Sequence, residues 1–245
     1  MANYPRSLIL HDGSTFHITW KCHNDKFLLK SEFSKECYYD LLLKYKNKYK
    51  VKFFSYCFMD NHPHLTGTCE TQKGLSDLFR VVNSCFSKTL NKHLKRKGQT
   101  VMDRFKSPLI QDDEGLREVM FYNDLNPFRT IKQILPKDFK WSSYHHYAYG
   151  KEDPLLSEPE FYLEWGKTPE ERQKVYREMV EAILKDDWHE AKVKDNNKEK
   201  RAKKRNYSTI YFIGDPKWVK IKYDKIRKRM ASIKQKRREK NKLKS

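Results

Sequence analysis

Two histidines stand two positions apart, His62 and His64, directly after an apolar and aromatic run at residues 53–59. Side chains two apart in a strand point to the same side of a sheet. An imidazole pair can hold a metal ion there, and a catalytic metal keeps positions open for substrate and water. His-x-His pairs also occur without a metal, so a structural role for the pair is the alternative.

A tyrosine on a later segment could use such a metal. Glu118, Tyr122 and Asn126 are spaced four apart, so in a helix they share one face. A phenol can act as a covalent nucleophile, but its ordinary pKa of about 10 keeps it protonated at neutral pH. A divalent metal would polarise a phosphoryl oxygen for attack. Asn126 could add its amide oxygen to the histidine pair, which would place nucleophile and Lewis acid side by side.

Hydrophobic patterns predict the elements that position these residues. Runs rich in β-branched and aromatic residues predict strands at residues 16–20, 51–59, 64–69 and 105–110. Helical spacing of apolar residues predicts helices at residues 30–49, 74–95 and 114–126. The order β-α-β-β-α-β followed by a helix is the split βαβ pattern. We therefore predict an α+β fold with a ferredoxin-like or RRM-like βαββαβ antiparallel sheet, helices on one face, and a basic C-terminal extension.

Two prolines bear on the strand edges, because proline cannot donate a hydrogen bond to a ladder. Pro63 suits the first residue of the third strand, and Pro108 predicts that the fourth strand lies at an edge. Beyond residue 136 the pattern indicates a loop at residues 140–144, a helix at 168–184, a basic linker at 192–205, a short strand at 207–213 and a basic helix after 215.

The positive charge is concentrated at one end of the 245-residue chain, whose formal net charge is +20. Residues 192–245 carry 22 Lys and Arg against 5 Asp and Glu, whereas the remaining residues carry 30 against 27. Such a polycation attracts phosphate backbones, although a solvated tail is the alternative. We predict a catalytic domain at residues 1–135, an appended loop and helix region at 136–191, and a basic linker with a DNA-binding helical tail at 192–245.

Composition argues against several other classes of protein. No apolar run reaches the roughly 18 residues of a membrane span, and no apolar signal core follows the N-terminus, so we expect a cytoplasmic, nucleoid-associated protein. The five cysteines are odd in number and include no Cys-x-x-Cys pair, which disfavours a disulfide framework or a cysteine zinc site.

The motifs resemble those of a known family, the single-tyrosine HUH transposases, and most closely the REP-associated tyrosine transposases. Residues 56–65 (YCFMDNHPHL) match the histidine–hydrophobe–histidine motif with its lead-in strand, and residues 122–129 (YNDLNPFR) are similar to the tyrosine helix. Residues 104–107 (RFKS) and 141–144 (WSSY) resemble two further signatures. Pro63 departs from the usual β-branched aliphatic, and Met102 and Asp103 stand where an aromatic residue often precedes Arg104.

The resemblance implies a metal held by His62, His64 and Asn126, with Tyr122 as the nucleophile. It implies cleavage and rejoining of single-stranded DNA at hairpins through a 5′-phosphotyrosine link and a free 3′-hydroxyl, without a small-molecule cofactor. The implied metal is Mg²⁺ or Mn²⁺. Imidazole and amide ligands suit Mn²⁺ or Zn²⁺ better than Mg²⁺, whereas Mg²⁺ is the more plentiful ion in cells. We expect a monomer, with a dimer that exchanges the tyrosine helix as the alternative.

Candidate DNA contacts lie around these motifs and in the basic linker: Arg104, Lys106 and Arg129 for phosphates, Trp141 and Tyr144 for base stacking, and Lys203, Lys204 and Arg205 in the linker. Packing of the Trp141–Tyr144 loop onto the core is the alternative to stacking. For His17, in the first predicted strand, a structural role is favoured over approach to the metal.

Two other functions fit the same pattern of elements. One is a domesticated hairpin-binding protein that no longer cuts, which a cleavage assay would distinguish. The other is an RNA-binding module of the RRM type, whose sheet displays aromatic residues. The histidine pair disfavours the RNA-binding module, and competition between single-stranded RNA and DNA would decide.

Overall fold

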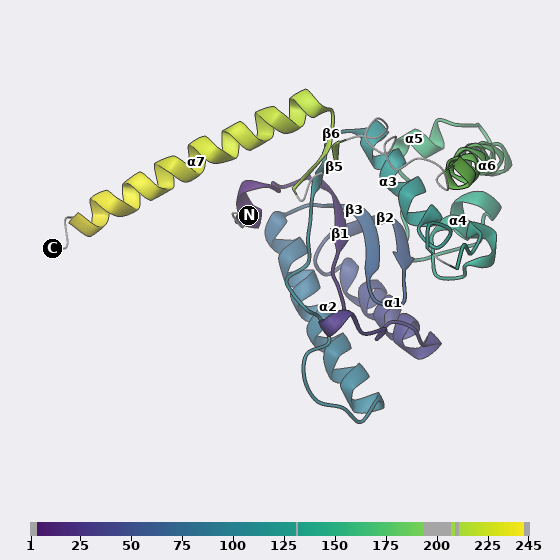
Figure 1. Ribbon diagram of the computed structural model, residues 1–245, viewed down its shortest axis with the longest axis horizontal. Coiled ribbons are helices and arrows are strands. Elements are labelled where there is room, and N and C mark those ends of the chain that lie inside the picture. Colours follow the sequence, from purple (N-terminus) through teal and green to yellow (C-terminus); the bar gives the residue numbers. More distant parts are fainter. Residues whose placement is uncertain (1–3, 131, 194–206, 209–210, 243–245) are drawn as a thin grey trace.

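The computed structural model describes residues 4–130, 132–193, 207–208 and 211–242 (Figure 1). Within these ranges the strands are β1 (Thr15–Thr19), β2 (Val51–Phe58), β3 (Pro63–Cys69), β4 (Leu109–Ile110), β5 (Tyr207–Ser208) and β6 (Phe212–Gly214). The helices are α1 (Glu32–Lys46), α2 (Gln72–His93), α3 (Asp113–Leu125), α4 (Tyr144–Tyr149), α5 (Glu160–Leu163), α6 (Pro169–Val193) and α7 (Pro216–Lys242).

The strands form one sheet in the order β2-β3-β1-β4-β6-β5. The antiparallel pairs among β1 to β4 give the predicted βαββαβ arrangement. The sheet is wider than predicted, because β6 pairs in parallel with β4 at Leu109 and Phe212. β4 therefore lies inside the sheet, and its predicted edge position is wrong. Pro108 precedes β4, and its carbonyl oxygen accepts a hydrogen bond from the His17 N–H at 3.0 Å.

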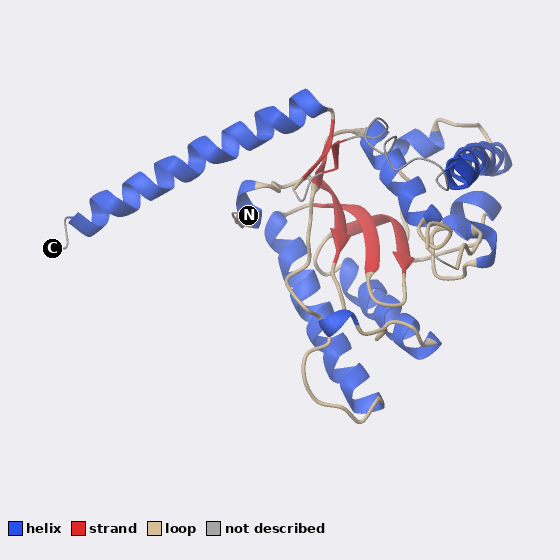
Figure 2. Cartoon of the chain, viewed as in Figure 1, coloured by secondary structure: helices blue, strands red, loops and turns tan. Residues whose placement is uncertain are grey.

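Strand alternation divides the side chains between two faces of the sheet. Phe16, Ile18 and Leu65 are fully buried in the core that the sheet shares with α1 and α2. His17 and His64 alternate with them and point to the opposite face, where α3 packs on β2 and β3. The helices α1 and α2 thus cover one face of the sheet, as predicted, whereas α3 packs against β2 and β3 on the opposite face (Figure 2).

The region predicted as an appendage, residues 136–191, shares a second core with α3. This core is rich in aromatic side chains, and its members include Phe121 of α3, Tyr144 and Tyr147 of α4, Tyr162 of α5 and Tyr176 of α6. The predicted loop at 140–144 lies along the free edge of β2: Ser142 forms a bridge with Cys57, and the Ser143 N–H donates to the Tyr56 carbonyl at 3.0 Å. The helix α6 continues to Val193, beyond the predicted end.

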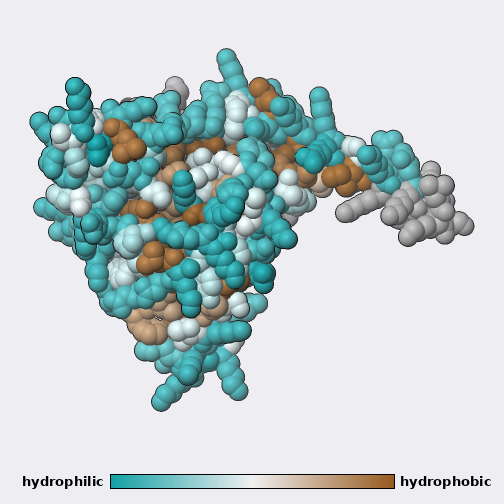
Figure 3. All heavy atoms as spheres, turned by 180° about the vertical axis from the view of Figure 1, so that it is seen from behind, coloured by the Kyte–Doolittle hydropathy of each residue, from teal (hydrophilic) through white to brown (hydrophobic). Residues whose placement is uncertain are grey.

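The long helix α7 packs on the first core through its first half, as far as Met230. Val219 and Ile226 are buried, and Trp218 packs edge-on against Phe212 with ring centroids 5.7 Å apart. Further along, Lys234 and Lys236 are exposed, and the helix projects away from the body (Figure 1). Its projecting surface is largely hydrophilic when seen from behind (Figure 3). No helix in the described ranges combines the length and apolar character that crossing a bilayer requires.

Candidate active site

The histidine pair lies at the junction of β2 and β3. His64 is the second residue of β3 and pairs with Cys57 of β2 and Thr19 of β1. His62 lies in the turn just before β3, outside the strand. The two histidines therefore do not share one strand, although their spacing had suggested that they would. The two rings nevertheless meet edge to face, with centroids 4.8 Å apart. The Asn61 Oδ1 atom lies 2.6 Å from His62 Nδ1 and orients the ring.

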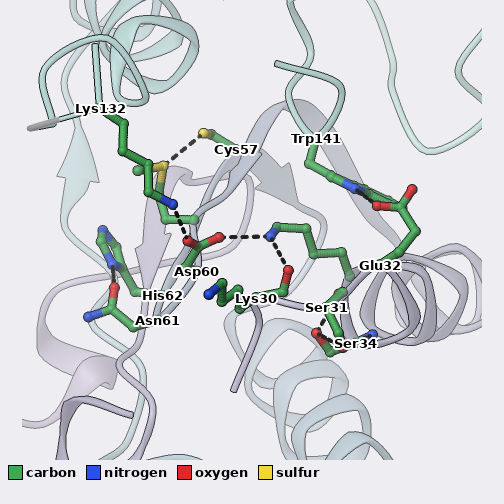
Figure 4. Close-up of polar contacts among 12 residues, drawn as sticks. Lys30, Ser31, Glu32, Ser34, Cys57, Asp60, Asn61, His62, Lys132 and Trp141 are labelled. Atoms are coloured by element: carbon green, nitrogen blue, oxygen red, sulfur yellow. Dashed lines mark hydrogen bonds and ion pairs between the residues drawn. The ribbon is translucent and has the colours of Figure 1, made fainter. Parts of the chain in front are cut away.

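Asp60 holds this turn in place. Its two carboxylate oxygens accept hydrogen bonds from Lys35 Nζ of α1 at 3.0 Å and from Lys132 Nζ at 3.2 Å. Figure 4 shows the Lys132 side chain reaching Asp60 beside Asn61 and His62. Since Lys132 follows α3 in the chain, Asp60 ties the histidine turn to the segment that leaves the tyrosine helix.

Tyr122 stands over the histidines from α3. The Asp112 side chain caps this helix, accepting a 2.9 Å hydrogen bond from the Gly115 N–H. The Tyr122 ring is edge-on to His64 with centroids 5.6 Å apart, and 41% of the residue is exposed. The Arg129 guanidinium carbon lies 5.5 Å from the centroid of the same ring. The structure therefore brings the candidate nucleophile, a histidine and a cation into one site.

Two buried polar residues after Tyr122 fix the helix. Asn123 Nδ2 donates to Ser55 Oγ of β2 at 2.9 Å. Asp124 accepts hydrogen bonds from Ser143 Oγ at 2.8 Å and from the Tyr176 hydroxyl at 2.6 Å. Burial raises the pKa of Asp124 to about 7, although both hydrogen bonds favour the carboxylate. These contacts join α3 to the sheet, to the Trp-Ser-Ser-Tyr segment and to α6.

His17 approaches the pair from β1, and its Nε2 atom lies 3.0 Å from His64 Nδ1. Burial lowers the pKa of His17 to about 4 and holds the pKa of His64 well below its ordinary value. The pKa of His62 is also lowered, again by burial. The three rings are therefore neutral near pH 7, which is the form that binds metals.

The unsatisfied atoms of the site suit a metal ion. His64 Nε2 and Asn126 Nδ2 are buried and lack a hydrogen-bond partner within the described part of the chain. A buried polar atom without a partner points to an ion or a water molecule, and half a turn of the amide exchanges its nitrogen for its oxygen. The described residues contain no metal-holding group of three or more His, Cys, Asp or Glu. A metal site here would draw on the two imidazoles, and the buried Asn126 amide, one helical turn after Tyr122, is the candidate for a third ligand.

Two of the three candidate phosphate contacts, Lys106 and Arg129, lie beside this centre. Thr19 pairs with His64 on one side and bridges Lys106 on the other, so the exposed Lys106 shares the histidine face of the sheet. Arg129 lies over Tyr122, and Arg104 is exposed two residues before Lys106.

The two candidate stacking residues are engaged in packing. Tyr144 is buried in the second core and is only 4% exposed, so its ring offers no face to a base. Trp141 donates its indole N–H to Glu32 Oε2 at 2.8 Å and packs near Phe58. The alternative of packing onto the core is therefore correct for Tyr144. The predicted linker contacts Lys203, Lys204 and Arg205 lie outside the described residues.

Sequence reasoning missed most of the residues that position the site. Asn123 and Asp124 follow Tyr122 in α3 and precede the apolar Leu125. Polar residues next to an apolar position in a helix could have indicated buried hydrogen bonds. For His17, alternation placed the residue on one face of β1, but only the register of β1 against β3 brings it to His64.

Residues 11–106 match the family model of IS200-like transposases. This IS200-like segment includes His17, His62 and His64, whereas Tyr122 and Asn126 lie beyond its end. The resemblance to tyrosine transposases that the motifs predicted is thereby confirmed.

A solved structure described as a REP-associated tyrosine transposase bound to a REP hairpin is similar to this chain. The two share 17% sequence identity with a TM-score of 0.52, over 65% of this chain and 93% of that one. At this level of identity the likeness establishes the fold. A search of curated proteins finds no match to this chain.

Proposed function

We propose that this chain is a transposase that cleaves and rejoins single-stranded DNA at hairpins, with Tyr122 as the nucleophile. The observation that carries the proposal is the edge-on packing of the Tyr122 ring against His64, with ring centroids 5.6 Å apart. This packing joins the tyrosine motif to the histidine motif across 58 residues of sequence. Tyr122 is also partly exposed, which leaves it open to a substrate.

The proposed reaction exchanges one phosphodiester bond for another. The Tyr122 phenol oxygen attacks a backbone phosphorus, loses its proton and forms a 5′-phosphotyrosine link. The bond from phosphorus to the 3′ oxygen breaks, and that oxygen takes up a proton to become a free hydroxyl. A 3′-hydroxyl on the same or another strand reverses the sequence. No nucleotide or water is consumed, because the link conserves the energy of the original bond.

His62, His64 and Asn126 are the residues that would hold a divalent metal, Mg²⁺ in cells or Mn²⁺ as a substitute. When bound, the ion would polarise the scissile phosphate and fix it in line with the phenol. Burial of the imidazoles in neutral form keeps their lone pairs available. Arg129, whose guanidinium lies over the Tyr122 ring, would offset the charge that develops on the phosphate.

The hairpin substrate is supported by the similar structure, which is described as bound to a REP hairpin. Lys106 and Arg104 would contact the backbone of the single strand near the histidine face. The basic helix α7 and the linker before it would add contacts to phosphates outside the active site. This division assigns cleavage to the folded body and additional affinity to the tail.

The proposal is tested by incubating the full chain with Mn²⁺ and imperfect hairpins taken from the DNA that flanks the encoding gene. A covalent protein–DNA adduct is expected for the wild type and for Tyr149→Phe, a control at an exposed tyrosine of α4. Tyr122→Phe should form none. An unchanged adduct in Tyr122→Phe would contradict the nucleophile, and hairpin binding without cleavage would favour the non-cutting alternative. Stronger competition by single-stranded RNA than by DNA would favour the RNA-binding alternative.

A further inference from the structure

The contact between His17 and His64 has the geometry of a direct hydrogen bond between two imidazoles. The nitrogen atoms lie 3.0 Å apart, and the two ring planes are within 6° of parallel. The ring centroids are 5.2 Å apart. This distance exceeds the separation of the two nitrogen atoms by about the sum of the two ring radii. The rings therefore lie end to end rather than face to face, so an N–H on one points straight at the lone pair of the other.

This bond decides which nitrogen of His64 can bind a metal. Each neutral imidazole carries one N–H, and its other nitrogen carries the lone pair. If His64 donates through Nδ1, its buried and otherwise unpartnered Nε2 presents a lone pair. If His17 donates instead, His64 carries its proton on Nε2 and cannot be a ligand through that atom.

We propose that His17 is a positioning residue that accepts a hydrogen bond from His64 Nδ1–H and thereby directs the Nε2 lone pair of His64 toward the metal. The proposal rests on the metal role proposed for His64 above. Metal-bound histidines usually donate their second N–H to a fixed acceptor, which sets the tautomer and the ring orientation. A neutral imidazole performs this task without burying a further charge beside the site.

The fold holds the acceptor in place more firmly than a surface contact would. His17 is in the middle of β1, 8% exposed, between two fully buried residues, Phe16 and Ile18. The antiparallel register pairs His17 with Thr66 and Thr19 with His64, so the two imidazoles are diagonal neighbours on one face of adjacent strands. The Tyr122 ring is edge-on to both, at 6.4 Å from His17 and 5.6 Å from His64.

The direct test is the tautomer of His64 in the metal-free protein, read from long-range ¹H–¹⁵N NMR of the imidazole nitrogens. The His64 signals are identified by their loss in His64→Ala. We expect a protonated Nδ1 and an unprotonated Nε2 in the wild type. The opposite tautomer, with the proton on Nε2, would overturn the proposal whether or not the chain cleaves DNA.

A second test measures Mn²⁺ binding by calorimetry, without DNA. His17→Phe removes the acceptor and should weaken Mn²⁺ binding by about 10–100-fold. His17→Gln, whose amide oxygen can occupy the position of Nε2, should restore most of the affinity. Ile18→Val is the matched control, since it perturbs the same strand on the opposite face and should leave Mn²⁺ affinity unchanged.

A folded His17→Phe that binds Mn²⁺ as the wild type does would overturn the proposal. If His17→Phe fails to fold, the His17→Gln variant provides the test. Protonation of His64 on Nε2 instead of Nδ1 in His17→Gln would also overturn the proposal. Absence of a DNA adduct in a wild type that shows the expected tautomer and binds Mn²⁺ would count against the proposed function alone.

Discussion

Asn123 Nδ2 donates a 2.9 Å hydrogen bond to Ser55 Oγ, and this bond fastens the tyrosine helix to the strand beside the histidines. Ser55 Oγ in turn lies 2.6 Å from Thr66 Oγ1 on β3. Asn123→Ala should lower the free energy of unfolding by about 1–3 kcal/mol, because a buried hydrogen bond is lost. It should also slow adduct formation, since Tyr122 is the preceding residue.

Chemical denaturation and adduct kinetics together test this role of Asn123. Glu114→Ala, at an exposed position in the first turn of α3, serves as the control and should leave the rate of adduct formation unchanged. A stable Asn123→Ala with the wild-type rate would show that the bond to Ser55 does not position Tyr122.

Asp124 should give the protein a specific dependence of stability on pH. Its folded pKa of about 7 exceeds the ordinary value of 3.8, because burial disfavours the carboxylate. Between about pH 4 and 7 the folded state keeps a proton that the unfolded state has lost. The stabilising contribution is therefore complete below about pH 4 and is lost as the pH rises toward 7, at up to about 1.4 kcal/mol per pH unit.

Comparison with Asp124→Asn isolates this effect, because the buried histidines titrate in both proteins and cancel in the difference. Urea denaturation of the metal-free proteins should show the wild type losing stability relative to Asp124→Asn from pH 4 to 7, with a constant difference above that range. A difference that does not change with pH would mean that Asp124 is ionised throughout.

The bonds of Asn123 and Asp124 lie within one chain, so Tyr122 and the histidines of the same molecule should form the active site. Mixing Tyr122→Phe with His64→Ala should then give no adduct, since neither variant holds a complete site. Adduct formation by the mixture would indicate exchange of α3 between molecules. Light scattering of the wild type provides an independent readout, with a monomer expected.

The tail should contribute affinity that is sensitive to salt. Replacing the exposed Lys234 and Lys236 of α7 by Gln removes two cations from the part of the helix that projects beyond the body. If both contact phosphates, the slope of log K against log salt should fall by about one for each contact. Fluorescence anisotropy with a labelled hairpin measures the slope, and the double substitution should leave the cleavage rate at saturating DNA unchanged. An unchanged slope would leave these lysines without a DNA contact.

The sequence predicted the elements of the sheet and the pairing of motifs because both depend on local pattern. Alternation and helical spacing identified β1 to β3 and α1 to α3, and the spacing of four placed Tyr122 and Asn126 on one face. The short β4 was misplaced at an edge because its neighbour β6 lies about 100 residues away and carries no signal that links it to Leu109.

Hydrogen bonds between side chains that are far apart in the sequence were the other feature that local pattern could not predict. Tyr176 and Ser143 reach Asp124 only after α6 and the Trp-Ser-Ser-Tyr segment have packed on α3. The same packing buries Tyr144, which the sequence had offered as a base-stacking residue. The contact of His17 with His64 depends on strand register in the same way.

Tyr122 is the proposed nucleophile among the 15 tyrosines of the chain. Trypsin should release residues 118–129 as the peptide EVMFYNDLNPFR, in which Tyr122 is the one tyrosine. Mass spectrometry of the adduct, after nuclease trimming of the DNA, should find this peptide carrying a nucleotide through a 5′-phosphotyrosine link. A nucleotide on a different tyrosine peptide, with residues 118–129 unmodified, would contradict the account.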